Sequence, residues 1–243
     1  MIVYPEYWSI IGQPVKIADI EEMIIQTLAK TKCANLSFSG GLDSSLMLHF
    51  MTRVFHKISV FTIGFPETHP DIEYSRLVVK SVEEKFGNVE HEVFVPSADE
   101  VASETEKKPG PDVGVRLFYR FLAEKGIPGI IACDGIDEFM AGYYDHQQHP
   151  DEETYYKYIR RLRDEHLKPL DDNSKGVKVY LPYLDEGLLC LLAQIPIADK
   201  VDGENRKKVM IQMAKGRIPD AVIDRWKYGF CDALGIKKAK QWK

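Results

Sequence analysis

Two hydrophobic patterns alternate along the first part of the chain. Short continuous apolar segments predict buried strands, and apolar residues spaced three or four positions apart predict helices. The predicted strands lie at 33–38, 57–65, 91–95 and 129–133. The predicted helices lie at 18–30, 46–55, 71–86 and 113–125. Strands and helices that alternate at this spacing indicate an α/β fold with a doubly wound parallel sheet.

The strand pattern stops after Tyr144, and helical spacing dominates the rest of the chain. The predicted helices of this part lie at 151–166, 186–195, 206–215 and 219–225. Pro169 to Val177 is rich in turn-forming residues and is predicted to be a mobile loop. No Pro/Gly/Ser linker divides the two parts, so we expect a single domain over 1–243, with an α/β core at 1–145 and a mainly helical portion at 146–243.

The turn after the first predicted strand is the first candidate site. Residues 39–44 have the sequence Ser-Gly-Gly-Leu-Asp-Ser and lead into a helix. Paired glycines allow positive φ and let an anion approach the backbone, whose N–H groups bind phosphate at a helix start. Asp43 beside such a nest would hold a divalent cation that bridges the phosphates. An ordinary strand–turn–helix connection is the alternative, and no Gly-Lys-Ser/Thr follows to make a Walker A loop.

A second candidate site follows the fourth predicted strand. Asp134, Asp137 and Glu138 are carboxylates close enough in sequence to repel one another unless a cation or a catalytic step uses them. Ligands of doubly wound sheets bind at the carboxyl ends of the strands. Asp137 could therefore share a cation with Asp43 at that edge. The alternative is a helix start whose acidic residues suit the helix dipole.

Basic residues near the C-terminus form a third candidate group. Arg206-Lys207-Lys208 opens one predicted helix, and Lys227 follows another, between Trp226 and Phe230. Surface lysines are usually solvated. Departing pyrophosphate needs cationic partners, however, and a lysine buried by Trp226 and Phe230 would be a natural one.

The composition narrows the class of protein. The 243 residues have a formal net charge of -5 and a pI near 5.8, which argues against non-specific binding to nucleic acid or anionic membranes. The cysteines are widely spaced and fit neither a zinc site nor a disulfide framework, so we expect a reducing, cytoplasmic location. His146 and His149 have no carboxylates at ligand spacing and are predicted to be surface residues of a loop.

Several ordered motifs resemble those of one known family. Residues 39–45 resemble the pyrophosphate loop (PP-loop) of the N-type ATP pyrophosphatases, which have the adenine nucleotide alpha hydrolase-like fold. The asparagine synthetases and the β-lactam synthetases match best. Further segments resemble this family in the same order: 61–66, 133–138, 141–143, 181–185 and 225–230. The resemblance covers nearly the whole chain and corresponds to the synthetase domain.

The resemblance implies a role for each matching residue. The groups that would hold adenosine are the backbone at Ser37, Ile63 and Cys133, with Gly135 in the same nucleotide-binding set. The groups that would hold pyrophosphate are Ser39, Gly40, Gly41, Ser44 and Lys208, although Lys207 is only one position away. Asp43 and Asp137 would carry Mg²⁺. Lys227 would stabilise charge during adenylation and the later attack, and Asp134 stands near the acyl-adenylate, where the family has a glutamate.

The sequence departs from the family pattern in two respects. Asp134 is one methylene shorter than the family's glutamate, and Ala132-Cys133 replaces the usual Ser-Gly. A shift of about 1 Å at a catalytic group can cost on the order of a hundredfold in rate, so the substrate or the efficiency could differ. The family's N-terminal glutamine-hydrolysing domain is missing from this sequence. We therefore expect the nitrogen to come from free ammonia, another amine or a separate glutaminase chain.

The resemblance implies an ATP-dependent, magnesium-requiring ligase that adenylates a small carboxylate and then forms an amide and AMP. Aspartate and ammonia, giving asparagine, are the default substrates, and intramolecular amide closure is a less favoured variant. Such a protein would bind neither nucleic acid nor membranes and could be a homodimer. Two other classes stay open. One is an RNA-modifying enzyme with the same loop, and the other is a regulatory nucleotide-binding protein whose catalysis has decayed.

Overall fold

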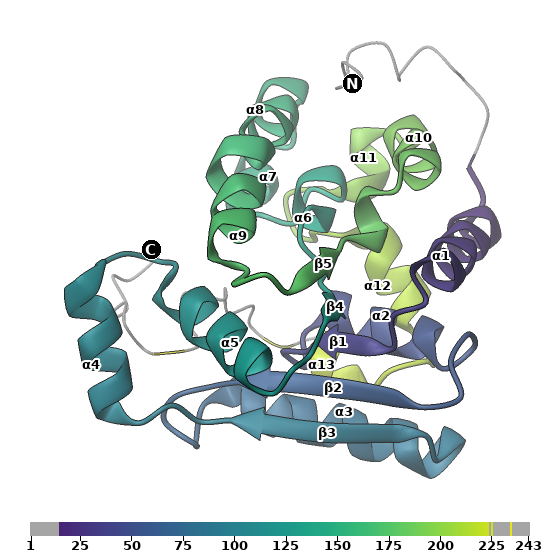
Figure 1. Cartoon of the computed structure of the whole chain (residues 1–243). Coiled ribbons are helices and arrows are strands. Elements are labelled where there is room, and N and C mark those ends of the chain that lie inside the picture. The colour runs from purple at the N-terminus through teal and green to yellow at the C-terminus, as the bar shows by residue number, and fades with distance from the viewer. Residues whose placement is uncertain (1–14, 224, 226–233, 235–243) are drawn as a thin grey trace.

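The structure of the chain is a computed structural model that describes residues 15–223, Arg225 and Leu234. These residues form an α/β fold around a parallel sheet, which confirms the predicted fold class (Figure 1). The predictions for Trp226, Lys227 and Phe230 concern residues outside the described part. No helix among the described residues is long and apolar enough to cross a membrane.

The sheet formed by the described residues has five strands in the order β3-β2-β1-β4-β5, and all neighbours are parallel. The strands are β1 (Asn35–Ser37), β2 (Ile58–Ile63), β3 (Val89–Phe94), β4 (Gly129–Ile131) and β5 (Lys178–Tyr180). Leu36 of β1 pairs with Val60 of β2 on one side and with Ile131 of β4 on the other. The strand order therefore reverses between β1 and β4, which is where doubly wound sheets bind ligands.

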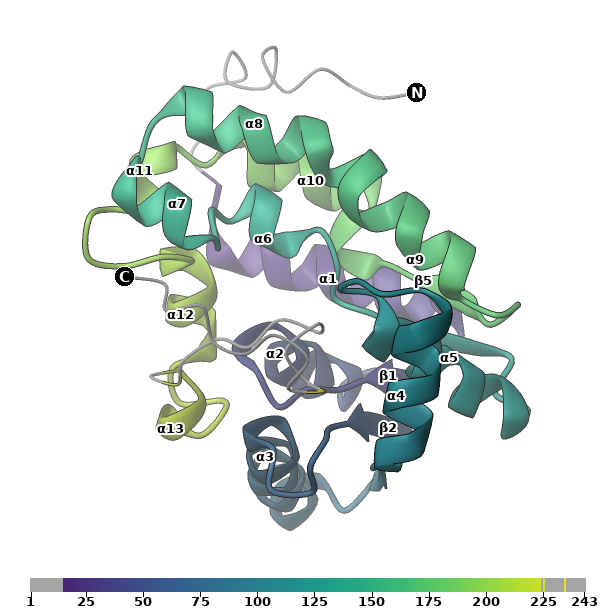
Figure 2. The same cartoon turned by 90° about the vertical axis from the view of Figure 1, so that its left-hand side faces the viewer.

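Helices cover both faces of this sheet. The helices are α1 (Ile17–Thr31), α2 (Leu42–Met51), α3 (Pro70–Phe86), α4 (Ala98–Lys107), α5 (Val113–Glu124), α6 (Ile136–Phe139), α7 (Tyr144–Gln148), α8 (Glu152–Leu162), α9 (Lys168–Asn173), α10 (Glu186–Gln194), α11 (Ile197–Lys200), α12 (Lys208–Ala214) and α13 (Asp220–Ile223). A π-helical turn, η2 (Arg163–Leu167), joins α8 to α9, and a 3-10 turn, η3 (Pro182–Leu184), follows β5. Helices α1, α2 and α3 lie on one side of the sheet, and α4 and α5 lie on the other (Figure 2).

The core is divided between the two faces of the sheet. Val60 and Phe61 are consecutive in β2, so their side chains point to opposite faces. Val60 packs in a buried cluster with Leu46 of α2, and Phe61 packs in another with Phe118 of α5. Burial on both faces explains why β4 is apolar throughout.

Local sequence sets both ends of α3. Pro70 takes the first helical position, where its missing N–H costs nothing, and His69 Nδ1 accepts a hydrogen bond from the N–H of Asp71 at 3.2 Å. Gly87 ends the helix with a φ of 64°, in the left-handed region that favours glycine. The helix start therefore holds Asp71 at the carboxyl edge of the sheet.

Two segments of the second half differ from the prediction. Residues 178–180 form β5, although no strand is predicted beyond Tyr144, because a strand this short shows no period and depends on pairing with β4. Residues 168–173 form helix α9, which overlaps the predicted mobile loop at 169–177. It continues α8 through η2, and this wider turn precedes Pro169, which has no N–H to bond back into a helix.

The prediction for His146 is also wrong. The residue lies in α7 rather than a loop, and its side chain is buried against the rings of Tyr143, Tyr155 and Tyr158. Burial lowers the pKa of His146 to about 4, so the ring is neutral at physiological pH. His149, at the end of α7, is exposed as predicted.

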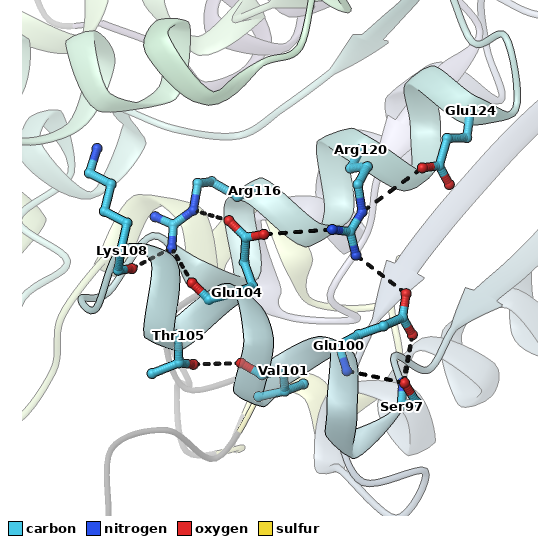
Figure 3. A network of polar contacts seen from close by, with 9 residues as sticks. All are labelled: Ser97, Glu100, Val101, Glu104, Thr105, Lys108, Arg116, Arg120 and Glu124. Atoms are coloured by element: carbon cyan, nitrogen blue, oxygen red, sulfur yellow. Dashed lines mark hydrogen bonds and ion pairs between the residues drawn. The ribbon is translucent and has the colours of Figure 1, made fainter.

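A network of ion pairs holds α4 against α5 (Figure 3). Arg116 Nε lies 2.5 Å from Glu104 Oε1, and Arg116 Nη2 donates to the carbonyl of Lys108 at 2.5 Å. The side chains of Arg116 and Glu104 are only 7% and 13% exposed, so water screens their attraction weakly. Arg120, which is 33% exposed, bridges Glu104 and Glu100. This network fixes the position of α5, whose opposite face reaches the sheet.

We predict that Arg116→Gln lowers the free energy of unfolding by about 3 kcal/mol, because the substitution leaves Glu104 buried without its closest partner. Arg120→Gln is the control and should cost about 0.5 kcal/mol, because Arg120 is partly exposed. Urea denaturation measures both. Equal losses in the two variants would contradict the importance assigned to Arg116.

The same pair predicts a pH dependence. Burial raises the pKa of Glu104, but the hydrogen bond and the charge of Arg116 outweigh it, and the net pKa lies below the ordinary value of 4.5. Stability from a lowered carboxyl pKa is present above the unfolded pKa and is lost as the pH falls through the folded pKa. The difference in stability between wild type and Arg116→Gln should therefore shrink below pH 4.5.

Candidate active site

The PP-loop connects β1 to α2 at the carboxyl edge of the sheet. Gly40 has a φ of 65°, and a Cβ on it would lie 2.3 Å from the backbone nitrogen of Ser75. The loop therefore rests directly on the backbone of α3, and only glycine fits there. Ser39 Oγ lies 3.3 Å from Ser44 Oγ and accepts a hydrogen bond from the N–H of Gly41 at 3.3 Å. These contacts preserve the compact turn that the sequence predicts.

The centre of the site is Lys207, which lies between two carboxylates. Its Nζ is 2.5 Å from Asp43 Oδ2 and 2.8 Å from Asp137 Oδ1. Asp43 lies in the first turn of α2 and Asp137 in α6, so the two predicted carboxylates do meet at one edge of the sheet. Burial alone would lower the pKa of Lys207, but the charges of Asp137 and Asp43 raise it above its ordinary value. The ammonium group therefore stays charged.

The backbone around Lys207 is specialised. Its φ is 53°, a left-handed conformation that costs a non-glycine residue on the order of 1 kcal/mol. This turn at the start of α12 directs Lys207 to the carboxylates. Lys208, the residue predicted to bind pyrophosphate, instead contacts Ala198 O at 2.8 Å and Asp202 Oδ2 at 3.0 Å. Lys207 lines a cavity together with Asp43 and Asp137, and Lys208 does not line it.

Residues distant in the sequence support this centre. Gly142 packs so closely that a Cβ on it would lie 2.0 Å from Asp137 Oδ1 and 2.3 Å from Lys207 Cε. Arg206 Nη1 donates to the carbonyl of Gly142 at 2.6 Å. Tyr183, fully buried after β5, donates its hydroxyl to the backbone carbonyl of Asp43 at 3.0 Å. The second half of the chain therefore holds both carboxylates in place.

A cavity of about 370 Å³ opens beside these residues. Its apolar lining includes Phe61 and Ile63 of β2, Phe118 and Tyr119 of α5, and Leu170 of α9. Its polar lining contains most of the predicted site residues, namely Ser37, Ser39, Gly41, Asp43, Ser44, Cys133, Asp134 and Asp137. An aromatic wall next to a PP-loop is suited to a nucleotide.

Gly40 and Gly135 shape the turns at the edge of the cavity. Neither lines the cavity, although both are predicted to bind nucleotide. Gly135 has a φ of 92° before α6, and a Cβ on it would lie 2.3 Å from Leu184 Cδ2. The glycine therefore permits the turn that presents Asp134 and Asp137.

Asp134 and Cys133 form the wall of the cavity beside Asp137. Burial, followed by the charge of Asp43, raises the pKa of the Cys133 thiol, which is therefore protonated and a poor nucleophile. Burial, followed by the charge of Asp134, raises the pKa of Tyr119. The phenol of Tyr119 is therefore a neutral hydrogen-bonding group near Asp134.

The charges of the site favour a ligand that brings its own cation. The described residues that line the cavity include five carboxylates and three cationic side chains. The carboxylates are Asp43, Asp71, Asp134, Asp137 and Glu204, and the cations are Arg206, Lys207 and Arg225. The carboxylates outnumber the cations, so this lining does not neutralise the charge of a bare triphosphate. No group of three or more His, Cys, Asp or Glu that could hold a metal occurs among the described residues. Two carboxylates are a ligand set that Mg²⁺ accepts, and a bound ion would share them with the Lys207 ammonium group, which contacts both.

Lys207, Arg225, Asp71 and Tyr183 were not predicted as site residues. Lys207 is adjacent to the predicted Lys208, and its left-handed φ has no signature in the sequence. Arg225 belongs to the segment that carries Lys227, but its partner Asp71 lies far away in the chain. The role predicted for Lys227 stays a prediction, because this residue lies outside the described part.

This fold and site define an α/β protein of the PP-loop type. A family model described as asparagine synthase matches residues 32–175 and 144–242. The chain belongs to the asparagine synthase family, which confirms the resemblance predicted from its motifs.

Curated proteins with the same family name are similar over most of this chain. A "probable asparagine synthetase (glutamine-hydrolyzing)" of Acanthamoeba polyphaga mimivirus is 24% identical, over 92% of this chain and 44% of the relative. Asparagine synthetase (glutamine-hydrolyzing) 2 of Oryza sativa subsp. japonica is 24% identical, over 88% of this chain and 41% of its own length. The Lotus japonicus protein of that name is 26% identical, over 84% and 37%. The chain spans less than half the length of these relatives.

We predict that Gly142→Ala destabilises the protein by about 2 kcal/mol, because the added methyl group must displace Asp137 or Lys207. The control is Gly203→Ala, at a glycine whose added Cβ would meet nothing within 4 Å. The control should change the free energy of unfolding by less than about 0.5 kcal/mol. Chemical denaturation distinguishes the two, and a Gly142→Ala variant as stable as Gly203→Ala would contradict the packing described here.

Proposed function

We propose that the protein is an ATP-dependent ligase that activates a carboxylate as an acyl-adenylate and then converts it to an amide. The observation that carries this proposal is the Asp43–Lys207–Asp137 centre, which lies beside a PP-loop in a cavity with an aromatic wall. Family membership supports the same class of reaction.

The cavity suggests where each part of ATP binds. The apolar lining from β2 and α5 would receive adenine, and the backbone at Ser37, Ile63 and Cys133 would bind adenosine. The loop N–H groups and the hydroxyls of Ser39 and Ser44 would receive the pyrophosphate part. Asp43 and Asp137 would hold Mg²⁺, which when bound would neutralise the phosphate oxygens and the leaving pyrophosphate.

Two displacements complete the proposed reaction. A carboxylate oxygen of the substrate attacks the α-phosphorus, and the bond to the β-phosphate oxygen breaks, so pyrophosphate leaves. The nitrogen of ammonia or an amine then attacks the acyl carbon, and AMP leaves with the electrons of the acyl–oxygen bond. Lys207 would stabilise the charge that develops on pyrophosphate, and the sequence predicts a similar task for Lys227. Asp134 would orient the incoming nitrogen and accept its proton.

Aspartate is the default substrate, because the curated relatives are named asparagine synthetases. This chain would differ from them at Asp134, because the side chain of Asp134 is one methylene shorter than that of the family's glutamate and holds its carboxylate further back. Free ammonia, an amine or a separate glutaminase chain would supply the nitrogen. Cytoplasmic location and a homodimer are the remaining predictions from the sequence.

We predict acid-dependent exchange of labelled pyrophosphate into ATP, with aspartate as the most active acid in a panel. Asp43→Asn and Lys227→Ala should each lower the exchange rate by about 100-fold or more, because each removes a group that stabilises transition-state charge. Asp172→Asn, at an exposed carboxylate of α9, is the matched control and should exchange like wild type.

The panel also separates the alternatives. Exchange with an acid other than aspartate would change the substrate but keep the class of reaction. Binding of ATP without exchange for any acid would contradict the ligase proposal and favour a regulatory nucleotide-binding protein. Undiminished exchange in Lys227→Ala would exclude the role predicted for that lysine.

A further inference from the structure

We propose that Arg225 is a positioning residue that fixes the PP-loop in its phosphate-binding conformation without contacting phosphate itself. This inference rests on the proposed function, because it assumes that the loop receives the triphosphate of ATP. Arg225 contacts both Asp71 and the loop residue Ser39.

Arg225 forms a buried ion pair at the edge of the cavity. Its Nη2 contacts Asp71 Oδ1, and the two side chains are each only 4% exposed. The guanidinium carbon lies 4.5 Å from the centre of the Tyr74 ring, a distance at which a cation is attracted to the ring face. Arg225 is therefore held from two sides by residues at the start of α3.

The same guanidinium group reaches the PP-loop. Arg225 Nη1 donates a hydrogen bond to the backbone carbonyl of Ser39 at 3.2 Å. The carbonyl and the N–H of one trans peptide point in opposite directions. By fixing the carbonyl of Ser39, Arg225 also sets the direction in which the N–H of Gly40 is presented. The orientation of such N–H groups decides whether a turn can bind an anion.

Packing makes the loop, α3 and Arg225 one unit. Gly40 rests on the backbone of Tyr74 and Ser75, and Asp71 is itself fixed at the start of α3 by His69. If Arg225 is removed, this support remains, but the carbonyl of Ser39 loses its charged donor. Asp71, which also lines the cavity, loses its contact with a buried cation at the same time.

The contacts argue against Arg225 as a direct phosphate ligand. Each of its terminal nitrogens already contacts a protein oxygen, of Asp71 or of Ser39, and its buried charge is balanced by Asp71. Lys207 is the cation that lies between the two proposed metal-binding carboxylates. In sequence, Arg225 stands two positions before Lys227. The contacts of Arg225 with Asp71 and Ser39 therefore fix the chain shortly before that predicted catalytic residue.

Nucleotide titrations of the whole chain test the proposal. We expect Arg225→Gln to weaken MgATP binding roughly tenfold to a hundredfold, and adenosine binding less than about twofold, because adenosine lacks the phosphates that the loop binds. Arg225→Lys keeps a charge opposite Asp71 but lacks the planar fork that makes both contacts, so its affinity for MgATP should be intermediate. Calorimetry measures both ligands under conditions in which each variant is folded.

Arg217→Gln is the matched control. Arg217 Nη1 also contacts a carboxylate, Glu21 Oε1 at 2.5 Å, and a backbone carbonyl, that of Met213 at 2.9 Å, but Arg217 does not line the cavity. Its substitution should leave the affinities for MgATP and adenosine unchanged. Amide hydrogen exchange at residues 39–41 adds a readout without ligand, and it should be faster in Arg225→Gln than in Arg217→Gln.

An unchanged affinity of Arg225→Gln for MgATP would overturn the proposal, and so would an equal loss of MgATP and adenosine binding. If Arg225→Gln does not fold, Arg225→Lys is judged by the same comparison. Wild-type binding of MgATP without acid-dependent exchange would contradict the ligase reaction and leave the positioning role standing. A wild-type chain that binds no MgATP would contradict both.

Discussion

The attraction of Lys207 to Asp43 and Asp137 is the interaction on which the site depends. Two carboxylates that are both largely buried would repel each other, and the ammonium group between them removes that cost. The parallel sheet brings α2 and α6 to one edge, and the left-handed turn before α12 adds the lysine. Gly142 gains its importance from the same centre, because a side chain there would separate the partners.

Contacts across the chain explain why an α/β core alone would be an incomplete site. Tyr183 bonds to the carbonyl of Asp43, Lys207 to its carboxylate, and Arg225 to the carbonyl of Ser39. All three residues come from the second half of the chain and end on the PP-loop or the first turn of the helix after it. The predicted mainly helical portion therefore supplies the charges and hydrogen bonds that orient the loop.

The local features of the site could be predicted from the sequence, and the long-range ones could not. Two signals are local: a glycine pair after one apolar strand, and a carboxylate cluster after another. Ligands of doubly wound sheets bind at the carboxyl ends of the strands, so the two signals predict one site. Lys207, and not Lys208, lies between the two carboxylates, and this depends on the left-handed φ of Lys207. The strand β5, the burial of His146 and the pairing of Arg225 with Asp71 depend on tertiary packing, which no local period encodes.

The central claim is that Asp43 and Asp137 would hold a divalent cation that accompanies the triphosphate of ATP. Calorimetric titration of ATP with and without Mg²⁺, into wild type and Asp137→Asn, tests it most directly. In wild type, Mg²⁺ should strengthen ATP binding by about tenfold or more, because the carboxylates repel the bare triphosphate. In Asp137→Asn most of this dependence should vanish. An equal dependence on Mg²⁺ in both proteins would contradict the account.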